Sequence, residues 1–212
     1  MARMTATGNT GAMPMRYRPV RRFTQLHAGL VLYGVSTTML LRARLGLDPW
    51  DVFHQGLAGH TGLRLGTVVI AVSALVLLPW VPLRQRPGVG TLCNAVVIGL
   101  VVNASLVLLP VPHALAARWT HAVGGVVLNG VATGLYIGAR LGPGPRDGLM
   151  TGYAARGHSI RVMRTTIEVT VLAAGWLLGG TVGWATLIYA LAIGPLAHAL
   201  IPLFSVRPAA AT

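Results

Sequence analysis

The sequence predicts an all-α polytopic membrane protein of about six transmembrane helices, arranged as two inverted three-helix repeats. Three observations lead to this prediction. Of 212 residues, 54% are hydrophobic and only 10% are charged, whereas an average soluble domain has about 25% charged residues. The apolar residues gather in blocks close to the length of a membrane span. An internal repeat relates the two halves of the chain.

Six apolar blocks meet or approach the roughly 20 helical residues that cross a hydrocarbon core about 30 Å thick. They cover residues 23–41, 65–83, 89–111, 115–137, 165–178 and 182–204. The chain then divides into a basic N-terminal tail (1–22), a first membrane repeat (23–111), a second membrane repeat (112–206) and a C-terminal tail (207–212). We expect the N-terminal tail to be flexible, because it lacks apolar periodicity.

The basic residues predict the orientation. All 17 are arginines, and with four acids the net charge is +13. They lie at the ends of apolar blocks, as the positive-inside rule requires, so we do not expect a nucleic-acid partner. With the N-terminus in the cytoplasm, only the arginines at positions 42, 44, 64 and 118 fall outside. Both termini are therefore predicted to be cytoplasmic.

The repeat aligns residues 29–51 with residues 125–147 at an offset of 96, with 12 of 23 positions identical. Residues 88–99 align with 183–194 at an offset of 95, with six of 12 identical. Each repeat contains three spans, an odd number, so the second copy enters the membrane from the opposite side. Inverted repeats of this kind are common in secondary transporters.

One polar motif occurs in both repeats, as ARLGLDPWD and ARLGPGPRD. Pro49 and Pro145 suit the first turn of a helix, where a missing amide breaks no bond. Asp51 and Asp147 would lie in that turn, near the positive end of the helix dipole. The short stretches that follow, about ten to eleven residues, cannot cross a membrane. They are either re-entrant half-helices that meet near the midplane or amphipathic helices on the membrane surface.

The charged motif residues and one intramembrane acid form the candidate transport site. These residues are Arg44, Asp48, Asp51, Arg140, Arg146, Asp147 and Glu168. A charge near the centre of a spanning helix costs about 2.5 to 3.5 kcal/mol, so Glu168 should face protein. It can form a salt bridge with Arg164, four residues earlier, or act as a proton-coupling carboxylate.

A second group of residues is expected to shape the backbone and the helix contacts. It consists of Gly34, Gly46, Pro49, Gly130, Gly142, Pro145 and Pro195. Glycines at helical spacing, such as Gly29, Gly34, Gly125 and Gly130, should pack the first span against the fourth. Pro195 should interrupt the sixth helix, because it removes an amide and clashes with the preceding turn.

Four ordered motifs resemble a known family. They are G-L-D-P-W-D, G-P-G-P-R-D-G-L-M, S-I-R-V-M-R at 159–164 and G-G-T-V-G at 179–183. Together they are similar to the YczE/YitT family of bacterial integral membrane proteins, over about residues 24–205. The resemblance implies a multi-pass protein of the bacterial cell membrane. It brings no substrate and no catalytic residues.

The sequence leaves two hypotheses for function. No nucleotide-binding loop, zinc-protease pattern or nucleophile elbow is present, so we expect neither an enzyme nor a cofactor or metal. The first hypothesis is a transporter or channel for a small solute or ion. The alternative is a non-transporting accessory or regulatory protein that binds a membrane or cytoplasmic protein, or lipid, through its Arg-rich loop. A water-accessible cavity containing both motif aspartates would favour the first hypothesis, and a dry core the second.

Overall fold

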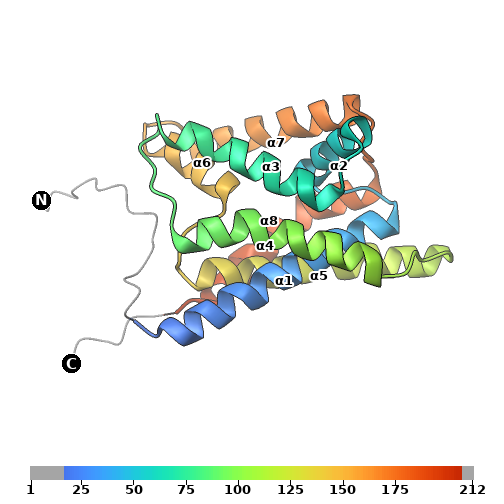
Figure 1. Cartoon of the computed structure of the whole chain (residues 1–212), viewed down its shortest axis with the longest axis horizontal. Coiled ribbons are helices and arrows are strands. Elements are labelled where there is room, and N and C mark those ends of the chain that lie inside the picture. Colours follow the sequence, from blue (N-terminus) through green and yellow to red (C-terminus); the bar gives the residue numbers. More distant parts are fainter. Residues whose placement is uncertain (1–16, 207–212) are drawn as a thin grey trace, which may run out of the picture.

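The computed structural model describes residues 17–206, and every secondary-structure element in this range is a helix, as predicted (Figure 1). The helices are α1 (Pro19–Ala43), α2 (Pro49–Thr61), α3 (Leu65–Leu77), the 3-10 helix η1 (Leu78–Trp80), α4 (Val89–Leu108), α5 (Leu115–Gly138), α6 (Pro145–Ala154), α7 (Ile160–Leu177) and α8 (Trp184–Phe204). The predicted tails at 1–16 and 207–212 lie outside the described residues.

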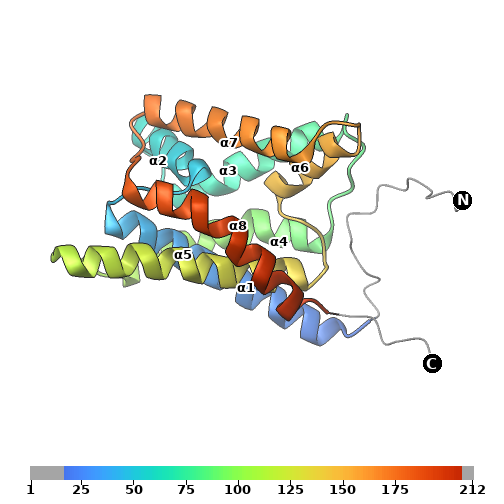
Figure 2. The ribbon, with the colours of Figure 1, turned by 180° about the vertical axis from the view of Figure 1, so that it is seen from behind.

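The helices form two layers. Helices α1, α4, α5 and α8 lie in one layer, and α2, α3, α6 and α7 lie in the other (Figures 1 and 2). Helix α1 packs against both α4 and α5, and α5 packs against α8. Leu26, Leu30 and Val102 are fully buried in the core between α1, α4 and α5. A second core, around Leu40 and Val126, joins α1 and α5 to α8.

Helices α1 and α5 run antiparallel, and each is capped by the other. Arg22, near the start of α1, donates from Nε to the Ala139 carbonyl and from Nη2 to the next carbonyl, each at 2.8 Å. Arg118, near the start of α5, makes the same two 2.8 Å bonds to the Ala43 carbonyl and the one after it. Arg22 and Arg118 are 96 residues apart, which is the repeat offset.

The turn that follows α1 is hydrogen-bonded to the start of α8, and the turn that follows α5 is hydrogen-bonded to the start of α4. The Leu45 carbonyl accepts the Ala185 amide at 2.8 Å, at the start of α8. The Leu141 carbonyl accepts the Gly90 amide at 2.9 Å, at the start of α4. In each case the bond crosses from one half of the chain to the other, so the halves are interlocked.

Glycine is required in both turns. Gly46 has φ +116° and Gly142 has φ +123°, a region that residues with a side chain rarely adopt. A Cβ at Gly46 would lie 2.5 Å from Thr186 Oγ1, and one at Gly142 would lie 2.9 Å from Thr91 Oγ1. These threonines close the first turns of α8 and α4. Only glycine at these two positions lets the turns approach the starts of α8 and α4 so closely.

The predicted glycine interface is only partly correct. Gly29 faces α5 and Gly125 faces α1, as expected. Gly34 instead lies against Val101 of α4, and Gly130 lies against α8. The assignment of these two glycines to the contact between the first and fourth spans is wrong. Residues five apart on a helix are rotated by about 140°, so Gly29 and Gly34 cannot share one face.

Several predicted boundaries also differ. Helix α1 begins at Pro19, so the end of the predicted tail is already helical. The second predicted span is a 13-residue helix that gives way to η1 at Leu78, beside Pro79. Helix α8 continues through Pro195, so the predicted interruption is wrong. Proline is tolerated inside membrane helices when neighbouring groups satisfy the freed carbonyl.

Fewer helices meet the length and apolarity of a membrane span than the six predicted. In the described part of the chain these are α4, α5 and α8, and α2 with α3 counts as a fourth if the pair, bent by 113°, is taken together. Polar residues such as Gln25 and His27 lower the apolarity of α1, and α7 carries Arg161, Arg164 and Glu168.

Candidate functional site

Two cavities lie where the starts of α2 and α6 approach each other. The first encloses about 530 Å³ and the second about 640 Å³, each including its open mouth. Trp50, Tyr136, Arg146 and Asp147 line both. The two cavities therefore meet at residues of the repeated motif and at one tyrosine of α5.

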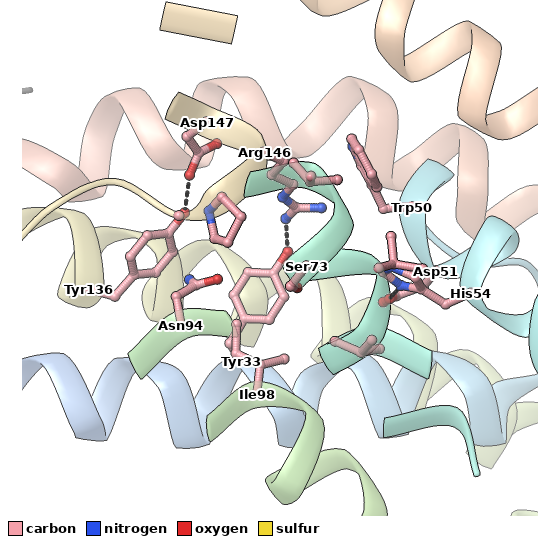
Figure 3. Close-up of a pocket in the computed structure, with 15 residues that line it drawn as sticks. Tyr33, Trp50, Asp51, His54, Ser73, Asn94, Ile98, Tyr136, Arg146 and Asp147 are labelled. Atoms are coloured by element: carbon pink, nitrogen blue, oxygen red, sulfur yellow. Dashed lines mark hydrogen bonds and ion pairs between the residues drawn. The ribbon is translucent and has the colours of Figure 1, made fainter. Parts of the chain in front are cut away.

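The first cavity is built from both halves of the chain (Figure 3). Asp51 of the first motif and Asp147 of the second both line it. Its other polar and aromatic lining residues are Tyr33, Trp50, Ser73, His54, Asn94, Tyr136 and Arg146. The α3 residues Val69, Val72 and Val76 close the apolar side.

Helix α2 begins with two buried carboxylates. Asp48 is the N-cap, and its Oδ1 accepts the Asp51 amide at 2.9 Å. Pro49 follows at the first helical position, as predicted. Asp51 Oδ1 lies 3.0 Å from His54 Nδ1, one turn later. Asp48 and Asp51 are only 1% and 5% exposed, and the Oδ2 atom of each has no hydrogen-bond partner among the described residues.

Helix α6 starts with a different set of partners. Gly144 takes the place of Asp48, so α6 has no side-chain cap. The Tyr136 hydroxyl donates to Asp147 Oδ2 at 2.6 Å (Figure 3). The Arg146 guanidinium donates to the Tyr33 hydroxyl and lies 5.4 Å from the Tyr33 ring centroid. Its Nη1 is 3.9 Å from Asp48 Oδ1, so an ion pair joins the two motifs.

The second cavity opens between α7 and α8. Arg164 and Glu168 of α7 line one side, and the Arg164 Nε to Glu168 Oε1 distance is 2.9 Å. The predicted salt bridge is therefore present. Tyr189 and apolar residues of α8, including Ile193 and Ala197, line the other side. Asp48 also faces this cavity.

The structure brings most of the candidate site residues together. Asp48, Asp51, Arg146, Asp147 and Glu168 each line at least one cavity. All four acidic residues of the chain are in that group. The two remaining candidates, Arg44 and Arg140, are exposed and line neither cavity. Both have positive φ at the ends of α1 and α5, where their carbonyls accept arginine bonds.

Sequence reasoning missed several lining residues. His54 could have been found, because a residue three positions after Asp51 lies on the same helix face. Tyr33, Asn94 and Tyr136 come from other helices, and no local pattern marks them. Among residues 17–206, no three His, Cys, Asp or Glu side chains gather as a metal site would need.

Comparison with known proteins identifies the family. A family of unknown function (DUF6198) matches residues 20–202. The chain belongs to this family. An uncharacterized protein of Haemophilus influenzae is 38% identical over 180 residues, covering 84% of this chain and 83% of that protein. The uncharacterized membrane protein YczE of Bacillus subtilis is 35% identical over 192 residues, 89% of each chain.

A more distant relative, the uncharacterized protein YyaS of Bacillus subtilis, is 23% identical over 180 residues, covering 82% of this chain and 90% of that protein. No solved structure matches. The resemblance to YczE inferred from the four motifs is confirmed.

Proposed function

We propose that this chain is a multi-pass protein of the bacterial cell membrane that transports a small solute or ion through the central cavities. One observation carries the proposal. Asp51 and Asp147, which occupy the same position in the two repeats, line a single cavity. In transporters built from inverted repeats, substrate and coupling-ion sites lie at the interface of the repeats.

The proposal includes an inverted arrangement of two three-span halves. The antiparallel course of α1 and α5 supports it, as do the reciprocal bonds of Arg22 and Arg118. In this arrangement α1 and α7 are also spans, with helical lengths of about 37 and 27 Å. The distribution of arginines then favours a cytoplasmic location for both termini.

Helices α2 and α6 act as half-helices in this proposal. They begin near each other, since Arg146 at the start of α6 is 3.9 Å from the N-cap of α2. The positive ends of two helix dipoles then point toward the cavities, as in transporters with broken helices. Irregular backbone before each half-helix is tolerated at membrane depth where it lines protein or a cavity.

Membrane location has independent support. The relative YczE is described as a membrane protein, and it matches this chain over 89% of both lengths. Three described helices are long and apolar enough to cross a bilayer. We therefore extend the membrane location of the relative to this chain.

Proteoliposome uptake tests the transport function. Purified wild-type protein would be screened against labelled inorganic ions, amino acids and small amines, beside Asp51→Asn and Asp147→Asn. We expect uptake of at least one solute by wild type and loss of it in both variants, because both carboxylates line the cavity. Arg86→Gln, in an exposed connection, is the control and should retain uptake. Equal uptake by all four proteins would contradict a role for the cavity.

One observation favours the alternative of an accessory or regulatory protein. Helix α7 buries only Gly175, and it exposes Val162, Val169 and Trp176. A partner protein could cover this face, next to the Arg-rich connection before α7. Such a role predicts that Trp176→Ser abolishes partner capture. It also predicts that Asp51→Asn and Asp147→Asn leave partner capture unchanged.

A further inference from the structure

The charge of the first cavity is opposite to that of the protein. The chain has 17 arginines and four acids, yet every acid lines one of the two cavities. In the first cavity Asp51 and Asp147 face a single arginine, Arg146. Arg146 is also 3.9 Å from Asp48 of the second cavity, and the two cavities together are lined by four carboxylates and two arginines, Arg146 and Arg164. The lining therefore favours a cation.

Asp51 offers the cation a hydrogen-bond acceptor. The residue is 5% exposed, and one of its carboxylate oxygens is bonded to His54. The Asp51 carboxylate lines the first cavity. A nearby cation stabilises a buried carboxylate that has few hydrogen-bond donors. A ligand with positively charged N–H groups would supply such a donor.

Asp147 is less available for this role. Its Oδ2 already accepts the Tyr136 hydroxyl at 2.6 Å, and the residue is adjacent to Arg146. The two aspartates of the repeat therefore differ in their partners: Asp51 faces His54, whereas Asp147 already has a hydroxyl donor.

The walls of the cavity suit an organic cation. Tyr33, Trp50 and Tyr136 all line it. The Arg146 guanidinium is already placed 5.4 Å from the Tyr33 ring centroid, so the site stabilises a cation on an aromatic face. Trp50 has the stronger π-face, and it is next to Asp51 in the chain. An apolar side formed by α3 valines would contact a hydrocarbon group.

We propose that the first cavity binds a small protonated amine, with its ammonium group between the Asp51 carboxylate and the Trp50 ring. The inference rests on the proposed function for the role of the cavity in transport and adds the class of substrate. The ammonium group donates to the Asp51 carboxylate, and its alkyl chain packs on the valines of α3.

Equilibrium dialysis of labelled butylamine against the full-length protein in lipid nanodiscs tests this proposal. We expect saturable binding at neutral pH, competed by unlabelled butylamine but not by 1-butanol or butyrate. Asp51→Asn should weaken binding about 30-fold, because it removes one partner of a buried charge pair. Asp51→Glu keeps the charge and should recover part of the affinity.

A tryptophan pair provides the matched control. Trp50→Leu should weaken butylamine binding about three- to tenfold through loss of the cation–π contact. Trp184→Leu changes the same residue type at a position that is 68% exposed, and should leave affinity unchanged. Melting temperatures in detergent would verify that each variant is folded.

The outcomes separate this inference from the proposed function. Absence of saturable binding, equal competition by 1-butanol, or unchanged affinity in folded Asp51→Asn would overturn the amine site. Uptake of a neutral or anionic solute that is lost in Asp147→Asn but kept in Asp51→Asn would overturn it too, while leaving transport intact. Asp51-dependent butylamine binding without uptake of any solute would support the amine site and contradict transport.

Discussion

The last two helices of each half, α3 with α4 and α7 with α8, are arranged differently in the two halves. In the first half α3 lies directly on α4, and a side chain at Gly66 or Gly99 would collide with the carbonyl oxygen of the other. The Gly66 amide also donates to Asn103 Oδ1 at 2.9 Å. In the second half α7 and α8 stand on opposite sides of the second cavity.

The sequence explains part of this difference. When the starts of α3 and α7 are aligned, Arg161 takes the place of Gly66. Gly194 is the repeat counterpart of Gly99, and a Cβ there would meet nothing within 4 Å. Two facing glycines let the backbones of α3 and α4 touch. The second half has no such pair, because an exposed arginine stands opposite the Gly66 position in the alignment.

The largest effect is expected from a matched pair of glycine variants. Gly99→Leu should destabilise the fold by about 3 kcal/mol or more, because the side chain would overlap the backbone of α3. Gly194→Leu should be tolerated, since its surroundings are open. Thermal melting in detergent would compare the two. Similar melting temperatures would mean that α7 and α8 also close on each other.

Cysteine labelling would show whether the second cavity is reached by water. Ala197 lines it, and Val102 is its repeat counterpart, fully buried between α1 and α4. In a Cys93→Ala background, Ala197→Cys should react with a membrane-impermeant thiol reagent about tenfold faster than Val102→Cys, because reactivity follows exposure. Equal rates would refute the difference between the halves.

The two capping arginines should differ in strength. Arg22→Met and Arg118→Met each remove bonds from a charged donor, worth about 1.5 to 3 kcal/mol. Arg22 is fully buried, whereas water can reach Arg118. We therefore expect Arg22→Met to lower stability by about 1 kcal/mol more than Arg118→Met. Denaturant titration in detergent measures this, and the reverse order would show that burial of Arg22 contributes nothing.

Equal losses of stability are expected for Gly34→Leu and Gly130→Leu, because the two glycines pack against corresponding residues of the two halves. Gly34 lies against Val101, and Gly130 lies against Leu196, its counterpart. Leucine at either position would crowd a side chain that can partly move, so each variant should cost about 1 to 3 kcal/mol. The two melting temperatures should agree closely. A clear gap would indicate that the inner contacts have also diverged.

The sequence predicted the helices and the polar motif better than the site. Proline and aspartate positions placed the starts of α2 and α6, because local capping depends on neighbours in the chain. Arg22 falls at the end of the predicted basic tail, although Arg118 occupies the matching position in the second repeat. Tyr33 and Tyr136 reach the cavity through tertiary packing between α1 and α5, which single-sequence periodicity does not report.

The interlocked hydrogen bonds have a consequence for biosynthesis. The first half of the chain is synthesised before the second. Arg22 therefore cannot form its hydrogen bond until Ala139, more than a hundred residues later, has been added. The Leu45 carbonyl likewise cannot accept the Ala185 amide until that residue has been synthesised. An early fragment that ends near residue 111 therefore cannot complete either contact. Translation has to pass Ala185 before the nascent chain can form both contacts.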